Sequence, residues 1–137
     1  MSYKVQKLNY YYTITQDKPG EAHKILSMLA DVGVNQLAFN ISHIGPERSQ
    51  ITLFPEDDAK LASVAERAGF SLDGPYNAFL VHGTDELGAL VDVHEKLHNA
   101  NINIATSTAI ADGHGSFGYV IYVRPDDYEK AAATLSI

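Results

Sequence analysis

The chain carries one sequence pattern twice, at a spacing of 68 residues. Asp17-Lys18-Pro19-Gly20 precedes an apolar-periodic segment that ends at Gly33-Val34-Asn35, and Asp85-Glu86-Leu87-Gly88 precedes another that ends at Asn101-Ile102-Asn103. The spacing is about half of the 137-residue chain. This repeat predicts one small unit that has been duplicated and fused, and it marks the repeated loop as the place to look for function.

The two copies have the same predicted order of elements. In the first copy, apolar periodicity and turn residues predict a strand over 5–15, a helix between Gly20 and Gly33, strands over 34–42 and 49–54, a helix over 55–69 and a short strand over 70–72. The second copy predicts a strand over 76–82, a helix over 88–99, strands over 102–111 and 117–124, and a helix over 125–134. Because a crossover helix packs back on its sheet with fixed handedness, we expect an α+β protein. It consists of two tandem ferredoxin-like βαββαβ units, each with an antiparallel sheet and its helices on one face.

Asp73-Gly74-Pro75 consists of turn-forming residues and is the predicted boundary between the copies. The expected domains are therefore residues 1–74 and residues 75–137. Only Leu135-Ser136-Ile137 follow the last predicted helix. We therefore expect the closing strand of the second domain to be short or absent.

Composition narrows the classes of function. The chain has no cysteine, which excludes disulfides, thiolate metal sites and cysteine nucleophiles. Its net charge is −7. Residues 1–74 have seven Lys/Arg and nine Asp/Glu and contribute −2. Residues 75–137 have three Lys/Arg and eight Asp/Glu and contribute −5. An acidic surface repels phosphate backbones and anionic lipids, so no nucleic-acid or membrane partner is expected. The N-terminus lacks a signal-like pattern, which favours an unprocessed cytoplasmic protein.

His94-Glu95-Lys96-Leu97-His98 matches the His-Glu-x-x-His helix of zinc metalloproteases. Such a site needs a third protein ligand, and the sequence that follows the motif offers none at a suitable spacing. A metal-dependent hydrolase at His94, Glu95 and His98 stays an alternative, and packing or surface histidines are favoured. We expect no enzyme, no metal and no cofactor.

A second alternative is RNA binding. Phe117-Gly118-Tyr119-Val120-Ile121-Tyr122 has the aromatic spacing with which βαββαβ RNA-recognition modules stack bases, and Phe79 could complete the platform. Gly115 stands where those modules carry Lys or Arg. The fingerprint Gly-x-Gly-x-x-Gly also occurs, at 113–118, but it lies between two predicted strands and indicates a hairpin turn.

A strand that ends in Asp-x-Pro-Gly, a helix that ends in Gly-Val-Asn, a hairpin and a second helix together resemble the ACT domain, a βαββαβ sensor of small molecules in amino-acid metabolism. The resemblance covers residues 10–72 and 77–135 in two tandem copies. Gly88-Ala89-Leu90-Val91 is similar to the Gly-Ala-Leu-Val motif of the phenylalanine-sensing ACT domain of prephenate dehydratases. Thr108-Ala109-Ile110-Ala111 stands where the companion Glu-Ser-Arg-Pro motif would follow, so phenylalanine specificity is not implied.

The resemblance implies a non-catalytic, amino-acid-binding regulatory protein that forms a homodimer through its sheets or helices and acts on a separate partner. It also implies a site where the strand-to-helix loop of one unit faces the start of the second strand of a neighbouring unit. Free N–H groups at a helix N-terminus attract a carboxylate, and Asp17 and Asp85 either accept the ligand's ammonium group or cap their helices. The additional carboxylate of Glu21 makes the second loop the preferred site. The expected ligand-binding residues are Asp17, Gly20, Glu21, Ala22, Asn35, Gln36, Asp85, Gly88, Ala89, Leu90, Asn103, Ile104 and Ala105.

Overall fold

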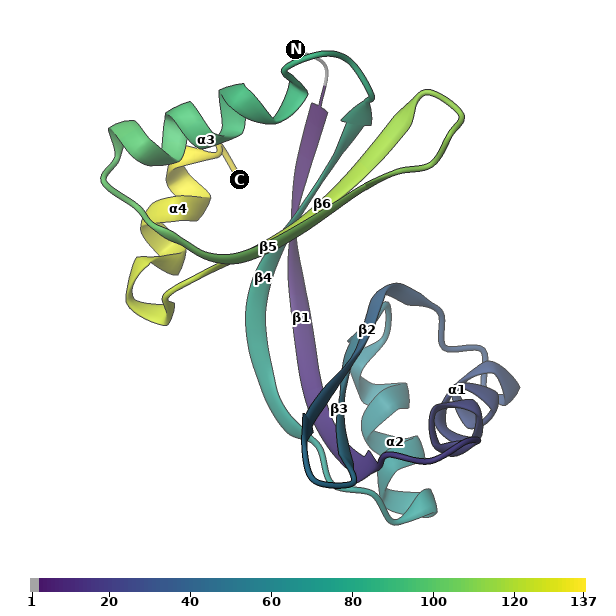
Figure 1. The fold of residues 1–137 in the computed structure, drawn as a ribbon. Helices are drawn as coiled ribbons and strands as arrows, with labels where there is room; N and C mark the ends of the chain where they lie inside the picture. Colours follow the sequence, from purple (N-terminus) through teal and green to yellow (C-terminus); the bar gives the residue numbers. More distant parts are fainter. Residues whose placement is uncertain (1–2) are drawn as a thin grey trace. The chain divides into compact units, whose positions relative to one another are not determined.

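The computed structural model describes residues 3–137, and its strands and helices alternate in the predicted order (Figure 1). The predicted α+β fold class is confirmed. The elements are β1 (Tyr3–Gln16), α1 (Glu21–Asp31), β2 (Gln36–Gly45), β3 (Arg48–Pro55), α2 (Asp58–Ala68), β4 (Asp73–Thr84), α3 (Ala89–Asn99), β5 (Ile104–Ala111), β6 (Ser116–Val123), a short 3₁₀ helix (Pro125–Asp127) and α4 (Tyr128–Thr134).

The chain divides into two compact units, and two strands contribute to both of them. The first unit is Asn9–Tyr76, and the second unit combines the described residues up to Leu8 with Asn77–Ile137. The strand order is β2-β3-β1-β4 in the first unit and β5-β6-β4-β1 in the second. Among the described residues, each unit therefore has four strands and two α-helices. No strand follows α4, and the N-terminal part of β1 takes the place of the second copy's closing strand beside β4.

β4 differs from the sequence prediction at its start. The strand predicted over 70–72 is wrong, because these residues lie outside the strands and β4 begins at Asp73. β4 also runs through Asp73-Gly74-Pro75, the turn-like segment. Gly74 has a φ of 146°, and a Cβ atom there would lie 2.8 Å from the carbonyl oxygen of Tyr10. Glycine therefore serves a close approach between strands at this position.

The spacing of 68 residues also relates the two sheets pair by pair. Tyr11 pairs with Leu53 and Thr13 with Ile51, and the equivalent pairs in the second unit are Phe79 with Ile121 and Val81 with Tyr119. The β2–β3 and β5–β6 ladders agree in the same way. Each residue of one loop region therefore has a defined structural counterpart in the other.

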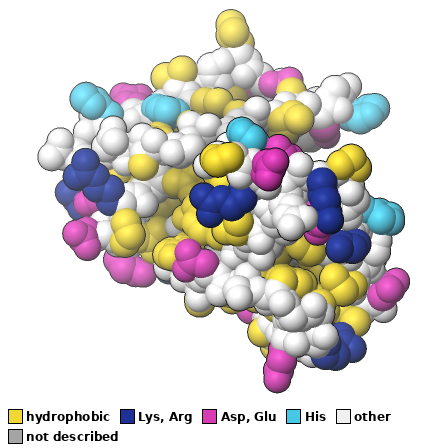
Figure 2. Space-filling view, turned by 60° about the horizontal axis from the view of Figure 1, so that its bottom comes forward, with side chains coloured by type: hydrophobic (Ala, Val, Ile, Leu, Met, Phe, Trp, Pro, Cys, Tyr) yellow, Lys and Arg dark blue, Asp and Glu magenta, His cyan; other side chains and the backbone are white. Residues whose placement is uncertain are grey.

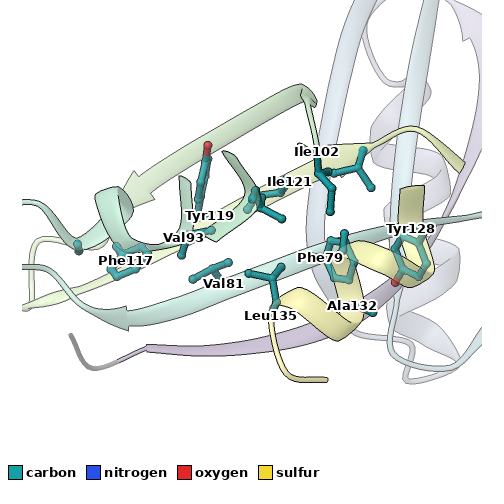
Figure 3. Packing of buried hydrophobic residues seen from close by; sticks show 14 residues of the cluster. Phe79, Val81, Val93, Ile102, Phe117, Tyr119, Ile121, Tyr128, Ala132 and Leu135 are labelled. Carbon is teal, nitrogen blue, oxygen red and sulfur yellow. The ribbon is translucent and has the colours of Figure 1, made fainter. Parts of the chain in front are cut away.

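Each unit buries one face of its sheet under two helices. Ile25 and Leu29 of α1, and Val93 and Leu97 of α3, are buried at a spacing of four residues, which places each pair on one helix face. The first core also contains Val34, Ile51, Leu53, Leu61 and Val64. The second core is larger and includes a stacked pair, Phe79 and Tyr128, whose ring centroids lie 4.5 Å apart (Figure 3).

Tyr3 fixes the start of β1 to α3 within the second unit. Its hydroxyl donates to Asp92 Oδ2 at 2.5 Å and accepts a hydrogen bond from Lys96 Nζ at 3.0 Å. Burial and the bond to Asp92 raise the pKa of Tyr3, and the same bond lowers the pKa of Asp92. The segment that completes the second sheet is thus held by side chains as well as by the strand ladder.

Candidate functional site

The two repeated loops have the same main-chain geometry. The N–H of Asp17 donates to the carbonyl of Glu47 and the N–H of Asp85 to the carbonyl of Gly115, both at 2.8 Å. Gly20 and Gly88 precede the helices with φ values of 92° and 76°, a region that favours glycine. The backbone therefore presents two equivalent helix N-termini, and any difference between the loops comes from side chains.

In the first loop the carboxylate of Asp17 is already bound. His43 Nδ1 donates to Asp17 Oδ2 at 2.9 Å, and Ser49 Oγ donates to Asp17 Oδ1 at 3.1 Å. We call Asp17, His43 and Ser49 the latch. The interpretation of Asp17 as a helix cap is wrong, because the N-cap of α1 is Gly20 and no side chain caps it.

In the second loop the counterparts of His43 and Ser49 are Ala111 and Phe117, whose side chains have no hydrogen-bond donor. Asp85 is exposed, and within residues 3–137 its carboxylate has no hydrogen-bond or ion-pair partner. It is not a helix cap either, since the N-cap of α3 is Gly88 without a side-chain bond. The latch of the first copy is therefore absent from the second loop.

A pocket of about 640 Å³ opens at the second loop. One wall is the segment from Asp85 to Val91, and the other is the end of β5 with Phe117. On β5, Ala109 and Ala111 stand at the positions that Ile41 and His43 occupy on β2. These small side chains leave the space between strand and helix open.

The main chain at this pocket offers fewer donors than the sequence predicted. The N–H of Ala89 donates to the carbonyl of Glu86, and that of Val91 to the carbonyl of Gly88, both at 3.0 Å. None of the loop and cap hydrogen bonds found in residues 3–137 uses the N–H of Gly88 or Leu90. Gly88 and Leu90, which line the same pocket as Asp85, therefore offer two backbone donors to a ligand.

Within each unit, the residues predicted to form the opposing wall of the site do not line the strand-to-helix loop. Asn103 and Ile104, which precede and begin β5, line a separate hollow with His98 and Ser107, and Ala105 follows them on the strand. At the start of β2, Asn35 donates to Glu56 at 3.3 Å and Gln36 accepts from the N–H of Phe54 at 2.9 Å.

Instead, the end of β5 forms the wall of the second pocket. The sequence carried a signal for it in Ala109 and Ala111, two small residues within the segment 108–111 that replaces the Glu-Ser-Arg-Pro motif. In the first loop, Glu21 pairs with Lys18 and Lys24 at 3.4 and 3.5 Å, and Ala22 is half-buried beside it.

The two alternative sites are not assembled. His94 Nε2 and the Tyr119 hydroxyl are hydrogen-bonded at 2.7 Å, His98 is exposed, and residues 3–137 contain no group of three or more side chains suited to hold a metal ion. The predicted base-stacking platform is wrong, because Phe79, Phe117 and Tyr119 are buried under the helices. Alternation along β4, which carries Phe79, and along β6, which carries Phe117 and Tyr119, turns these aromatic rings inward.

Two further observations concern surface charge and the helices of the described residues. On the face drawn in Figure 2, Lys and Arg side chains are interspersed with Asp and Glu side chains. Across residues 3–137, no helix has the length and apolar character needed to cross a membrane.

No protein-family model matches the sequence, and no curated protein matches it. Solved structures do resemble the fold. A protein from Bacteroides thetaiotaomicron matches with a TM-score of 0.79 and 17% identity, over 98% of this chain and 88% of the other. The ligand-free regulatory subunit of aspartate kinase from Thermus thermophilus matches with a TM-score of 0.66 and 15% identity, over 99% and 95%. The same subunit from Thermus flavus matches with a TM-score of 0.62 and 15% identity, over 99% of this chain and 95% of the other. These likenesses support the expected α+β fold of ferredoxin-like βαββαβ units.

Proposed function

We propose that this protein is a non-catalytic regulator that binds an amino acid at its second loop. The observation that carries the proposal is the unpartnered carboxylate of Asp85 beside a pocket of about 640 Å³. The ammonium group of the ligand binds Asp85, and its carboxylate accepts hydrogen bonds from the N–H groups of Gly88 and Leu90. A carboxylate at this place also gains from the positive end of the α3 dipole.

The first loop takes no ligand in this proposal. His43 and Ser49 donate to the carboxylate that an ammonium group would need. Glu21 places a further negative charge at the α1 N-terminus, where the ligand's carboxylate would have to bind. Asp17, Gly20, Glu21 and Ala22 are therefore structural, and the two copies have different roles.

We further propose that the protein is a homodimer. β2 lies at the edge of the first unit's sheet and exposes four large apolar side chains, Leu37, Phe39, Ile41 and Ile44. This ten-residue edge has no Lys, Glu or Pro, the residues that usually prevent edge pairing. Pairing of such edges between chains would bring Asn35 and Gln36, or Asn103, Ile104 and Ala105, to a neighbouring loop.

The regulated protein is a separate cytoplasmic partner in this proposal. A ligand shifts an equilibrium only by its difference in affinity for two states, so binding must favour one association state or one partner complex. The regulatory subunits of aspartate kinase with the same fold support such a role.

Isothermal titration with each of the twenty amino acids, after a thermal-shift screen, tests the proposal. We expect one or a few to bind, and Asp85→Asn to weaken binding at least tenfold, because a charge-assisted bond to the ammonium group is lost. The matched control is Asp17→Asn at the latch, which should leave affinity unchanged. No heat with any amino acid, or equal loss in both variants, would contradict the proposal.

A further inference from the structure

The pocket at the second loop has an unbalanced set of charges. Its lining includes two carboxylates, Asp85 and Glu86, and no Lys, Arg or His. An amino-acid ligand has one ammonium group for Asp85 and one carboxylate for the backbone N–H groups. A second carboxylate on the ligand would find no counter-charge in this lining, and it would face the existing carboxylates instead.

The rest of the lining is apolar and unusually open to solvent. Val91 is 62% exposed, Ile110 is 73% exposed, and Leu87 is fully exposed. Leu90 and the buried Phe117 also line the hollow. A cluster of exposed apolar side chains around a hollow is typical of a surface that is covered when its ligand binds.

The depth of the hollow depends on Ala109 and Ala111. In the first copy the same strand positions carry Ile41 and His43, and there the loop is latched. The exchange of two large side chains for two methyl groups opens the second loop toward β5. The space so created lies next to Leu90 and Val91, where it suits a hydrocarbon group.

We infer that the ligand of this site is an amino acid with an uncharged apolar side chain, aliphatic or aromatic, and that Ala109 and Ala111 set the size it accepts. This inference rests on the proposed function and adds the class of side chain to it. Each side-chain methylene that becomes buried in the pocket should raise affinity about fourfold.

Titration with L-leucine, L-asparagine and L-aspartate tests the class, because the three side chains have nearly the same shape and differ in polarity and charge. We expect leucine to bind at least tenfold more tightly than asparagine, and aspartate most weakly. L-Alanine, which lacks the hydrocarbon body, should bind at least tenfold more weakly than leucine. Tighter binding of aspartate or asparagine would overturn the inference and leave the proposed function standing. Failure of all twenty amino acids to bind would overturn both.

Variants of β5 test the size assignment. Ala109→Ile and Ala111→His introduce the first copy's side chains, and each should lower leucine affinity at least tenfold without changing the unfolding temperature by more than a few degrees. For Ala109→Ile the loss should be smaller for alanine than for leucine, whereas Ala111→His also introduces a donor for Asp85 and should weaken the binding of both. His43→Ala, the matched substitution in the first copy, should leave both affinities unchanged. Unchanged leucine affinity in both folded β5 variants would overturn the role of Ala109 and Ala111.

Discussion

The two strand-to-helix loops have one backbone and two sets of side chains. Both loops begin with an amide bonded to the neighbouring hairpin, and both place a glycine with positive φ before the helix. In the first loop, donors from β2 and β3 hold the aspartate, and in the second loop the counterparts are a methyl group and a phenyl ring. Duplication thus reproduces the framework of a site, and a few positions on the facing strands decide whether the site is open.

The largest change in unfolding free energy is expected for substitutions in the cores of the two units. Leu29 and Leu97 are equivalent and almost fully buried, so Leu29→Ala and Leu97→Ala should each cost about 2–5 kcal/mol of unfolding free energy. Urea unfolding followed by circular dichroism measures both. Saturating leucine should restore part of the stability lost in Leu97→Ala only, since it binds the second unit in our proposal. Equal rescue of both variants would show that the two units unfold together as one cooperative unit.

The glycines before α1 and α3 provide the next test. Gly20→Ala should cost about 1–2 kcal/mol, because its φ of 92° is unfavourable for a residue with a Cβ atom. No heavy atom lies within 4 Å of that Cβ position, so backbone strain is the only expected cost. Gly88→Ala should have a similar cost and should in addition weaken ligand binding. Thermal unfolding and calorimetric titration separate the two effects, and equal binding in both variants would place the ligand elsewhere.

One pair of equivalent positions in the two sheets should respond differently to alkaline pH, because only one of the two residues titrates. Burial, and then the hydrogen bond to Asp58, raise the pKa of Tyr11 to about 12, and its counterpart in the second unit is Phe79. A raised pKa contributes stability that is fully present below about pH 10 and is lost as the pH rises through about 12. Tyr11→Phe should therefore unfold with a weaker dependence on pH in this window. Thermal unfolding across the window measures this, and an unchanged profile would contradict the assignment to Tyr11.

The latch should have the smallest effect on stability. His43 and Asp17 are both exposed, and exposed pairs contribute little, so His43→Ala should cost less than about 1 kcal/mol. Chemical denaturation measures the loss, with His114→Ala at the exposed second hairpin as the control. A loss above about 2 kcal/mol would mean that the latch supports the fold of the first unit as well as closing its loop.

The order of elements and the helix faces were predictable from sequence because they depend on local periodicity. Ile25 with Leu29, and Val93 with Leu97, follow the helical period and are buried as expected. The hydrogen bonds of the Asp17 carboxylate were not predictable, because its two partners lie 26 and 32 residues away in the sequence. Local residue preferences indicated a cap, and tertiary contacts provided a different partner.

The path of β4 could not be predicted from local residue preferences either. Asp73-Gly74-Pro75 has the composition of a turn, and its place in a strand depends on the close approach of Tyr10. The wall of the second pocket was missed for a related reason. The small residues of β5 could be read from the sequence, but only the strand register shows that Ala109 and Ala111 stand where the first copy carries Ile41 and His43.

The contribution of β1 to the sheet of the second unit has a consequence for inheritance. If residues 75–137 were separated as a gene fragment, their unit would lack the strand that begins the chain, and β4 would be left with an unpaired edge. The first copy therefore cannot be deleted, even though its loop is latched. The first loop can therefore change without removal of the strand on which the second unit depends.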